Sequence, residues 1–208
     1  MNRNNLLYTV IFTFAASFFF VFFLSLANTL TAEKTEANER ISFYSAFLNA
    51  AGIEFSGKNS AEEVFLKSFP SAGSFPYRQT IRASVAGEDM LLKLFSGSGL
   101  WGTITGVLAV SPDLSEIKGL EIITHNETPG LGGRIEEEWF KNQFRGEQVS
   151  KDPGSKKISV IKGTGRGADT DPSNSEVEGV TGATLTSISI ETIINNTLAE
   201  LAVEEASK

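Results

Sequence analysis

The chain has 208 residues, with 18 Lys and Arg against 25 Asp and Glu, a single His and no Cys. The absence of Cys excludes a disulfide-stapled miniprotein, a cysteine-ligated iron–sulfur protein and a thiol enzyme. The formal net charge of -7 argues against nucleic acid as a partner, because such binders need clustered Lys and Arg to neutralise phosphates. At roughly 100 to 200 residues per domain, the length predicts one globular domain with an appendage.

The appendage lies at the N-terminus, where no charged residue occurs from Asn4 to Ala32. Within this stretch, the 22 residues from Leu6 to Ala27 include only four polar residues and seven Phe. A helix of that length rises roughly 33 Å, which is enough for a hydrocarbon core of about 30 Å. We therefore expect a membrane anchor. A cleaved signal peptide is the alternative, because Ser25-Leu26-Ala27 resembles a cleavage site, but the apolar run exceeds the usual length of about 7 to 15 residues.

The rest of the chain predicts helices first and then strands. A helix is expected over Ala32 to Ala51, followed by a short helix that Ser60 and Glu63 would begin with a capping box. From Tyr77 the hydrophobic period changes to two. The predicted strands are Tyr77 to Ala86, Met90 to Phe95, Thr103 to Val110 and Ile117 to Thr124. The short turns between them predict an antiparallel meander.

The C-terminal part completes an α+β fold. We expect a helix around Arg134 to Phe144, a strand at Ile158 to Ile161 and a closing amphipathic helix from about Thr186 to Ala202. The predicted division is an anchor over residues 1–31, a helical connector over 32–76 and a sheet domain over 77–208.

Two Gly-rich segments match nucleotide motifs only in part. Gly97 to Gly102 fits G-x-G-x-x-G, but a β-branched, alternating segment follows it and not the helix that a dinucleotide fold needs. Gly163 to Gly167 lacks the Lys-Ser/Thr ending of a triphosphate-binding loop. We expect this second segment to be a flexible, solvated connection that continues through Asp169 to Ser175.

Two other segments are the candidates for chemistry. His125 to Gly133 leads from a strand end into a Gly-rich turn, where backbone amides can approach a ligand closely. Glu178 to Ser187 is a loop of small residues that leads into the last helix, and a helix N-terminus favours a phosphate group. The alternative is that Thr186 or Ser187 merely caps this helix and that Thr184 is an ordinary turn residue.

These two segments resemble a known family. Thr181-Gly182-Ala183-Thr184, with an acid three residues before it, resembles the flavinylation motif D-x-x-[ST]-G-A-T, although the acid is Glu178 and not Asp. The segment from Glu127 to Gly132 resembles the second hallmark of the same family, and Gly99-Leu100-Trp101 also fits. The family comprises the FMN-binding subunits of ion-pumping respiratory complexes, namely those of the sodium-translocating NADH:quinone oxidoreductase and of the related Rnf ferredoxin:NAD complex.

The resemblance implies a site for covalent FMN. The final Thr of the motif, Thr184, would carry the flavin through a phosphoester bond. The implied neighbours are Thr181, Gly182 and Ala183 in the acceptor loop, Glu127, Thr128, Gly130, Leu131 and Trp101 near the flavin ring, and Lys162 near the phosphate. For Trp101 a place in the hydrophobic core is the alternative, and for Lys162 a solvated charge at a strand end. No catalytic residue and no metal site are expected.

The resemblance also implies partners and a location. The chain would be an electron-transfer subunit of an oxidoreductase complex in the bacterial inner membrane, with a single span and its soluble domain on the periplasmic side. Its partners would be the other membrane subunits and, during maturation, a flavin transferase. Sequence details favour the quinone-reductase complex, whereas the short chain suits the Rnf complex equally well. A membrane-anchored binding or assembly module without a redox cofactor remains the alternative function.

Overall fold

The computed structural model describes residues 3–57, 60–70, 72, 80–152, 157–163 and 169–207. The chain divides into two compact units, Met1–Arg40 and Ile41–Lys208. The predicted boundaries after residues 31 and 76 differ from this division, because most residues from Phe43 to Ala51 are buried in the core of the second unit. The predicted strand residues 77–79 and the Gly-rich residues 164–167 lie outside the described residues.

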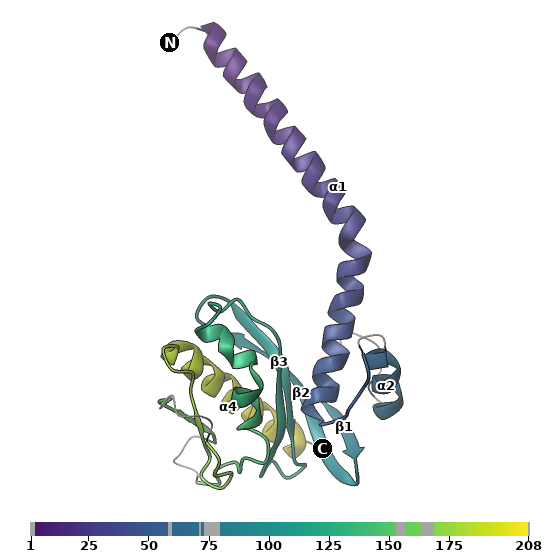
Figure 1. Cartoon of the computed structure of the whole chain (residues 1–208), viewed down its shortest axis with the longest axis vertical. Coiled ribbons are helices and arrows are strands. Elements are labelled where there is room, and N and C mark those ends of the chain that lie inside the picture. The colour runs from purple at the N-terminus through teal and green to yellow at the C-terminus, as the bar shows by residue number, and fades with distance from the viewer. Residues whose placement is uncertain are drawn as a thin grey trace. The chain divides into compact units, whose positions relative to one another are not determined.

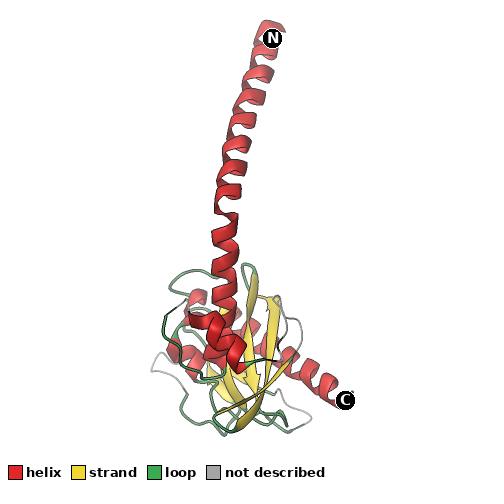
Figure 2. Ribbon diagram, turned by 90° about the vertical axis from the view of Figure 1, so that its right-hand side faces the viewer, coloured by secondary structure: helices red, strands yellow, loops and turns green. Residues whose placement is uncertain are grey.

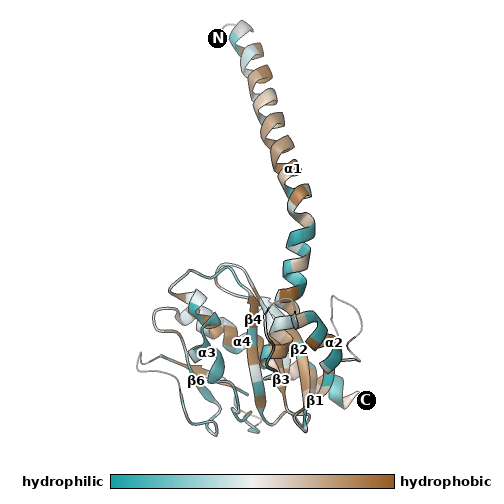
Figure 3. Cartoon of the chain, turned by 45° about the vertical axis from the view of Figure 1, so that its right-hand side comes forward, coloured by the Kyte–Doolittle hydropathy of each residue, from teal (hydrophilic) through white to brown (hydrophobic). Residues whose placement is uncertain are grey.

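The first unit is a single helix. Helix α1 runs over Arg3–Ala50, so the apolar segment and the helix predicted after it are continuous. No Gly or Pro occurs before Gly52, which leaves nothing in the sequence to interrupt the helix. An 18-residue window within Asn5–Ala50 has a mean hydropathy of 2.4 and is 0% buried, so this helix is long and apolar enough to cross a membrane. Figure 3 shows the apolar colours along its N-terminal turns.

The second unit is built on one antiparallel sheet, as predicted (Figure 2). Its strands are β1 (Ile81–Val85), β2 (Glu88–Ser98), β3 (Thr103–Val110) and β4 (Ile117–Thr124). Their spatial order is β1-β2-β3-β4, and every neighbouring pair is antiparallel. The bounds of β3 and β4 agree with the predicted ones, since both strands show a clear hydrophobic pattern between turns.

Both faces of the sheet are covered because apolar residues occur at consecutive strand positions. Leu91 and Leu108 belong to a core with helix α4 (Thr184–Ala206), whereas the adjacent Leu92 and Val107 belong to a second core. That second core contains the last turns of α1 and helix α2 (Ala61–Ser68). Figure 1 shows α2 on one side of the sheet and α4 on the other. The α+β class predicted from the sequence is thereby confirmed.

Two local predictions were wrong. The helix expected over 134–144 is a 3-10 helix, η2 (Gly132–Glu136), followed by α3 (Glu138–Asn142), because Glu137 between them has an extended backbone. The capping box is absent, since Ser60 is already helical and its hydroxyl donates back to the carbonyl oxygens of Ser56 and Gly57.

One short strand was not predicted. The irregular connection through Asp169 to Ser175 leads directly into β6 (Glu176–Glu178), which the sequence analysis did not identify. This strand pairs in parallel with β5 (Ser159–Ile161). A three-residue strand is too short to show a hydrophobic period, and only its long-range pairing defines it.

Candidate functional site

A buried carboxylate joins three segments that are distant in the sequence. Glu127 follows β4 and is only 4% exposed. Its Oε1 accepts hydrogen bonds from the backbone N–H groups of Leu100 at 2.8 Å and Trp101 at 3.1 Å, in the turn between β2 and β3. Its Oε2 accepts a hydrogen bond from the hydroxyl of Thr186, in the first turn of α4, at 2.5 Å. Glu127 therefore fixes the β2–β3 turn and the start of α4 relative to each other.

Two glycines make this close approach possible. A Cβ atom added at Gly99 would lie 2.5 Å from Glu127 Oε1, and one added at Gly132 would lie 2.5 Å from the Thr186 hydroxyl oxygen. The Gly99 amide also donates to the Gly102 carbonyl at 2.7 Å, which closes the turn before β3. Gly97 to Gly102 is therefore a hairpin turn followed by a strand, which confirms the rejection of a dinucleotide loop.

The predicted acceptor loop ends in an exposed threonine. Thr184 is the first residue of α4, and among the described residues its hydroxyl has no hydrogen-bond partner. Ser187 performs the local capping, since its hydroxyl accepts the Val180 amide at 3.0 Å and donates to the Ala183 carbonyl at 2.9 Å. Gly182 has a φ of 83°, a left-handed conformation that glycine adopts without strain.

The two candidate segments are neighbours in space. Leu131 Cδ2 lies 3.5 Å from the position that a Cβ would take at Gly182. Three apolar residues of the β2–β3 turn, the Gly-rich turn and the start of α4 are exposed, namely Trp101 (67%), Leu131 (46%) and Leu185 (59%). The alternative of a core position for Trp101 is therefore wrong. Exposed Thr184 thus belongs to a surface that offers both a hydroxyl and apolar area.

The remaining predicted residues shape the edges of this site. Lys162 is exposed at the end of β5, and the carbonyl of the next residue, Gly163, accepts a hydrogen bond from the Thr181 hydroxyl at 3.4 Å. The Thr128 carbonyl accepts the amides of Leu131 at 3.1 Å and of Gly133 at 3.0 Å, which forms the turn around Gly130.

The single histidine has structural contacts in the same region. Its Nδ1 atom accepts the Glu127 amide at 3.1 Å, and its Nε2 atom lies 3.3 Å from Glu136 Oε2. Among the described residues, no group of three or more His, Cys, Asp and Glu side chains is placed to hold a metal ion.

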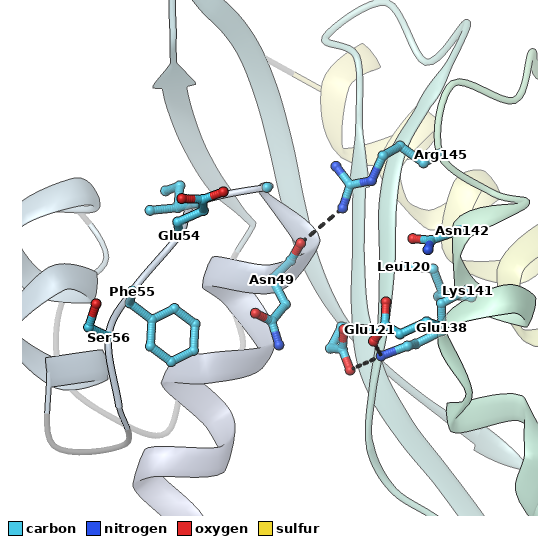
Figure 4. A pocket seen from close by; sticks show the side chains of 12 residues that line it. Asn49, Glu54, Phe55, Ser56, Leu120, Glu121, Glu138, Lys141, Asn142 and Arg145 are labelled. Carbon is cyan, nitrogen blue, oxygen red and sulfur yellow. Dashed lines mark hydrogen bonds and ion pairs between the residues drawn. The ribbon is translucent and has the colours of Figure 1, made fainter.

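A large cavity lies elsewhere in the second unit and contains none of the predicted site residues (Figure 4). It has a volume of about 690 Å³ between the end of α1, β4 and α3. Its polar groups are mostly bonded to one another: Arg145 donates to the Asn49 carbonyl at 3.1 Å, and Lys141 Nζ lies 2.7 Å from carboxylate oxygens of Glu121 and Glu138. These contacts join neighbouring elements of the second unit.

The residues around Thr184 fit a flavin mononucleotide. An exposed hydroxyl at the N-terminus of a 23-residue helix suits a phosphate group, because unpaired backbone N–H groups and the helix dipole favour negative charge there. The exposed side chains of Trp101 and Leu131 offer apolar contact to an aromatic ring.

Sequence reasoning missed the residues that hold these groups in place. The sequence indicates Thr186 and Ser187 only as possible caps, and it gives no signal for Gln143. The Gln143 amide bonds the backbone of Glu178, 35 residues later, and no local pattern signals a contact over that separation.

Comparisons with known proteins find similar sequences and similar folds. Residues 99–199 match the family described as "FMN-binding domain". A subunit of Na(+)-translocating NADH-quinone reductase from Yersinia pestis is 38% identical over 104 residues, which are 50% of this chain and 38% of that protein. The corresponding subunit from Neisseria meningitidis serogroup B is 30% identical over 141 residues, which are 65% of this chain and 53% of that protein. The chain thus spans about two fifths to one half of the length of these relatives.

Two solved structures share the fold. The structure of a Na(+)-translocating NADH-quinone reductase subunit from Parabacteroides distasonis superposes with a TM-score of 0.67 at 22% identity, covering 84% of this chain and 96% of that one. The structure of NqrC from Shewanella oneidensis gives a TM-score of 0.64 at 21% identity, covering 80% and 99%. The arrangement of the sheet and its helices is thus shared with proteins of this kind. Residues 99–199 of the chain, just under half of its length, thus match the FMN-binding domain family.

Proposed function

We propose that this chain is the flavin-carrying electron-transfer subunit of a membrane-bound, ion-translocating NADH:quinone reductase, and that FMN is esterified to Thr184. The observation that carries the proposal is the exposed Thr184 hydroxyl at the start of α4, in a loop whose Gly182 lies close to the exposed Leu131. Relatives that are subunits of the sodium-translocating enzyme favour this complex over the Rnf type.

The residues of the chain would hold the flavin and not perform acid–base chemistry. Bound FMN supplies reversible electron transfer, and the protein contributes attachment, orientation and electrostatic tuning. The backbone N–H groups at the start of α4 would stabilise the phosphate, with Lys162 as a further cation, and Trp101 and Leu131 would contact the ring. Glu127 points inward to Leu100, Trp101 and Thr186, so its role would be to hold this surface in place.

A covalent bond suits an electron carrier that changes its charge and redox state repeatedly. A tethered flavin stays at one site in each redox state, whereas a dissociable one is lost whenever a state binds weakly. Electrons would enter and leave through neighbouring subunits, and the ion would be moved elsewhere in the complex. The apolar part of α1 would anchor the chain in the bacterial inner membrane, with the second unit on the periplasmic side.

Mass spectrometry tests the attachment. No Lys or Arg occurs between Arg166 and Lys208, so trypsin releases Thr184 within the peptide 167–208. In chain produced with a flavin transferase, we expect this peptide to carry the mass of FMN less water, with fragment ions that place the addition on Thr184. The same chain should fluoresce on a denaturing gel.

Two variants separate Thr184 from other hydroxyls. Thr184→Ala should be dark on the gel, whereas Thr192→Ala, which alters an exposed threonine on the same helix, should fluoresce like the natural chain. Fluorescence retained in Thr184→Ala would place the flavin on another residue. A natural chain with the bare polypeptide mass, isolated from its native membranes, would instead favour a binding or assembly module without a redox cofactor.

A further inference from the structure

A buried glutamine clamps the strand that leads to the acceptor loop. Gln143 directly follows α3 and is 6% exposed. Its Oε1 atom accepts the backbone amides of Glu178 and of Asp169, each at 2.8 Å, and its Nε2 atom donates to the Glu178 carbonyl at 3.1 Å. One side chain therefore bonds both main-chain groups of Glu178, much as a neighbouring strand would.

The residues just after Gln143 hold the other end of the same segment. Glu147 is 1% exposed, and its carboxylate lies near the backbone amides of Ser175 and Glu176. The backbone amide of Gln148 donates to the Pro172 carbonyl at 2.7 Å. The chain between 169 and 178 is thus fixed to the segment after α3 at several points, although only three of its residues form a strand.

Short contacts connect the segment after Glu178 to the first turn of α4, where Thr184 lies. The next residue, Gly179, donates its amide to the Ile161 carbonyl at 2.9 Å, and a Cβ atom at Gly179 would lie 2.9 Å from the Ser187 hydroxyl oxygen. That hydroxyl also accepts the Val180 amide. Gly179 and Val180 are thus held closely against Ser187 in the first turn of α4. A displacement of β6 must therefore displace the acceptor loop as well.

We propose that Gln143 is a positioning residue for the modification of Thr184, because its amide holds β6, and with it the acceptor loop, in the geometry that a flavin transferase engages. The inference rests on the function proposed above. In the modification, a bond forms between Thr184 Oγ and the phosphorus of the flavin phosphate. With a flavin dinucleotide as donor, the diphosphate P–O bond breaks, a nucleoside monophosphate leaves, and the hydroxyl proton passes to solvent. No group is oxidised or reduced, and Gln143 takes no part in the bond changes.

The rate of flavin incorporation into the full chain tests the role of this amide. Gln143→Met keeps the length of the side chain but removes all three hydrogen bonds. We expect incorporation to slow about tenfold or more, which corresponds to the loss of one to two net hydrogen bonds in the productive geometry. Gln143→Glu keeps an acceptor for the two amides but loses the donor to the Glu178 carbonyl, and it should show an intermediate rate. Gln148→Met is the matched control, because Gln148 is exposed, and it should be modified at the natural rate.

Hydrogen exchange separates positioning from a general loss of stability. In the unmodified natural chain the Glu178 amide should exchange as slowly as amides of the central sheet. In Gln143→Met, protection should fall over residues 176–183, while β2 and β3 remain protected. This measurement on the natural chain stays decisive even if Gln143→Met fails to fold.

Three outcomes would count against the inference. A natural rate of incorporation in Gln143→Met overturns it, and so does fast exchange of Glu178 in the natural chain. A uniform loss of protection across the sheet in the variant would show that Gln143 serves stability alone. A natural chain that takes up no flavin would contradict the proposed function, whatever the exchange data show.

Discussion

The contacts of Glu127 lead to a quantitative prediction for Glu127→Ala. The substitution leaves the amides of Leu100 and Trp101 and the hydroxyl of Thr186 without their acceptor. Hydrogen bonds to a charged group are each worth about 1.5–3 kcal/mol, and a buried donor left unpaired costs about 1–3 kcal/mol. Water can reach the exposed turn at Trp101 and satisfy part of this loss. We therefore expect the free energy of unfolding to fall by about 4 kcal/mol.

Urea denaturation of the full chain in detergent measures this loss. The signal is the fluorescence of Trp101, made specific by a Trp139→Phe background, since the chain has two Trp. Glu200→Ala is the control, because Glu200 is exposed on α4, and its free energy of unfolding should stay within about 0.5 kcal/mol of the background.

The same experiment has a local readout. If Glu127 holds the β2–β3 turn against α4, Glu127→Ala should also make Trp101 more accessible to a soluble quencher in the folded state. A loss below about 1 kcal/mol together with unchanged quenching of Trp101 would refute the view that this carboxylate joins the three segments.

Two further predictions concern a glycine and a buried acid. Gly132→Ala places a methyl group 2.5 Å from the Thr186 hydroxyl oxygen and should lower the free energy of unfolding by about 2–4 kcal/mol. Gly130 has a φ of 75° and open space around it, so Gly130→Ala should lower the free energy of unfolding by only about 1 kcal/mol. Equal losses for the two variants in urea denaturation would contradict the steric argument. Burial raises the pKa of Glu147 from 4.5 to about 7, and one of its carboxylate oxygens has no partner among the described residues. A raised carboxyl pKa favours the folded state in its protonated form, so this contribution is present below pH 4.5 and is lost as the pH rises to about 7. Glu147→Gln removes the titrating carboxyl group. The free energy of unfolding of this variant minus that of the natural chain should therefore rise by up to about 3 kcal/mol between about pH 5 and pH 8. A difference that does not depend on pH would argue against a buried, titrating carboxyl group.

Much of the fold follows from local patterns in the sequence. The apolar run in α1, the alternation in β3 and β4 and the short turns between strands depend on residues close together in the chain, so they can be recognised without a structure. The acceptor motif is equally local, since Thr181 to Thr184 are consecutive. Local patterns therefore predicted the apolar helix and the antiparallel sheet, and the resemblance to a known family supplied the candidate attachment residue.

Only the tertiary structure showed how that residue is held. Glu127 and Thr186 are 59 positions apart, and Gln143 and Glu178 are 35 apart, yet each pair is hydrogen-bonded. Such contacts leave no periodic signal, because a buried polar side chain is chosen by the groups that surround it in space. The same reason explains why Glu127 was expected to face a ligand but turns inward, and why β6 exists only through its pairing with β5. Sequence thus determined which residues are available, and the folded chain decided which of them support the site.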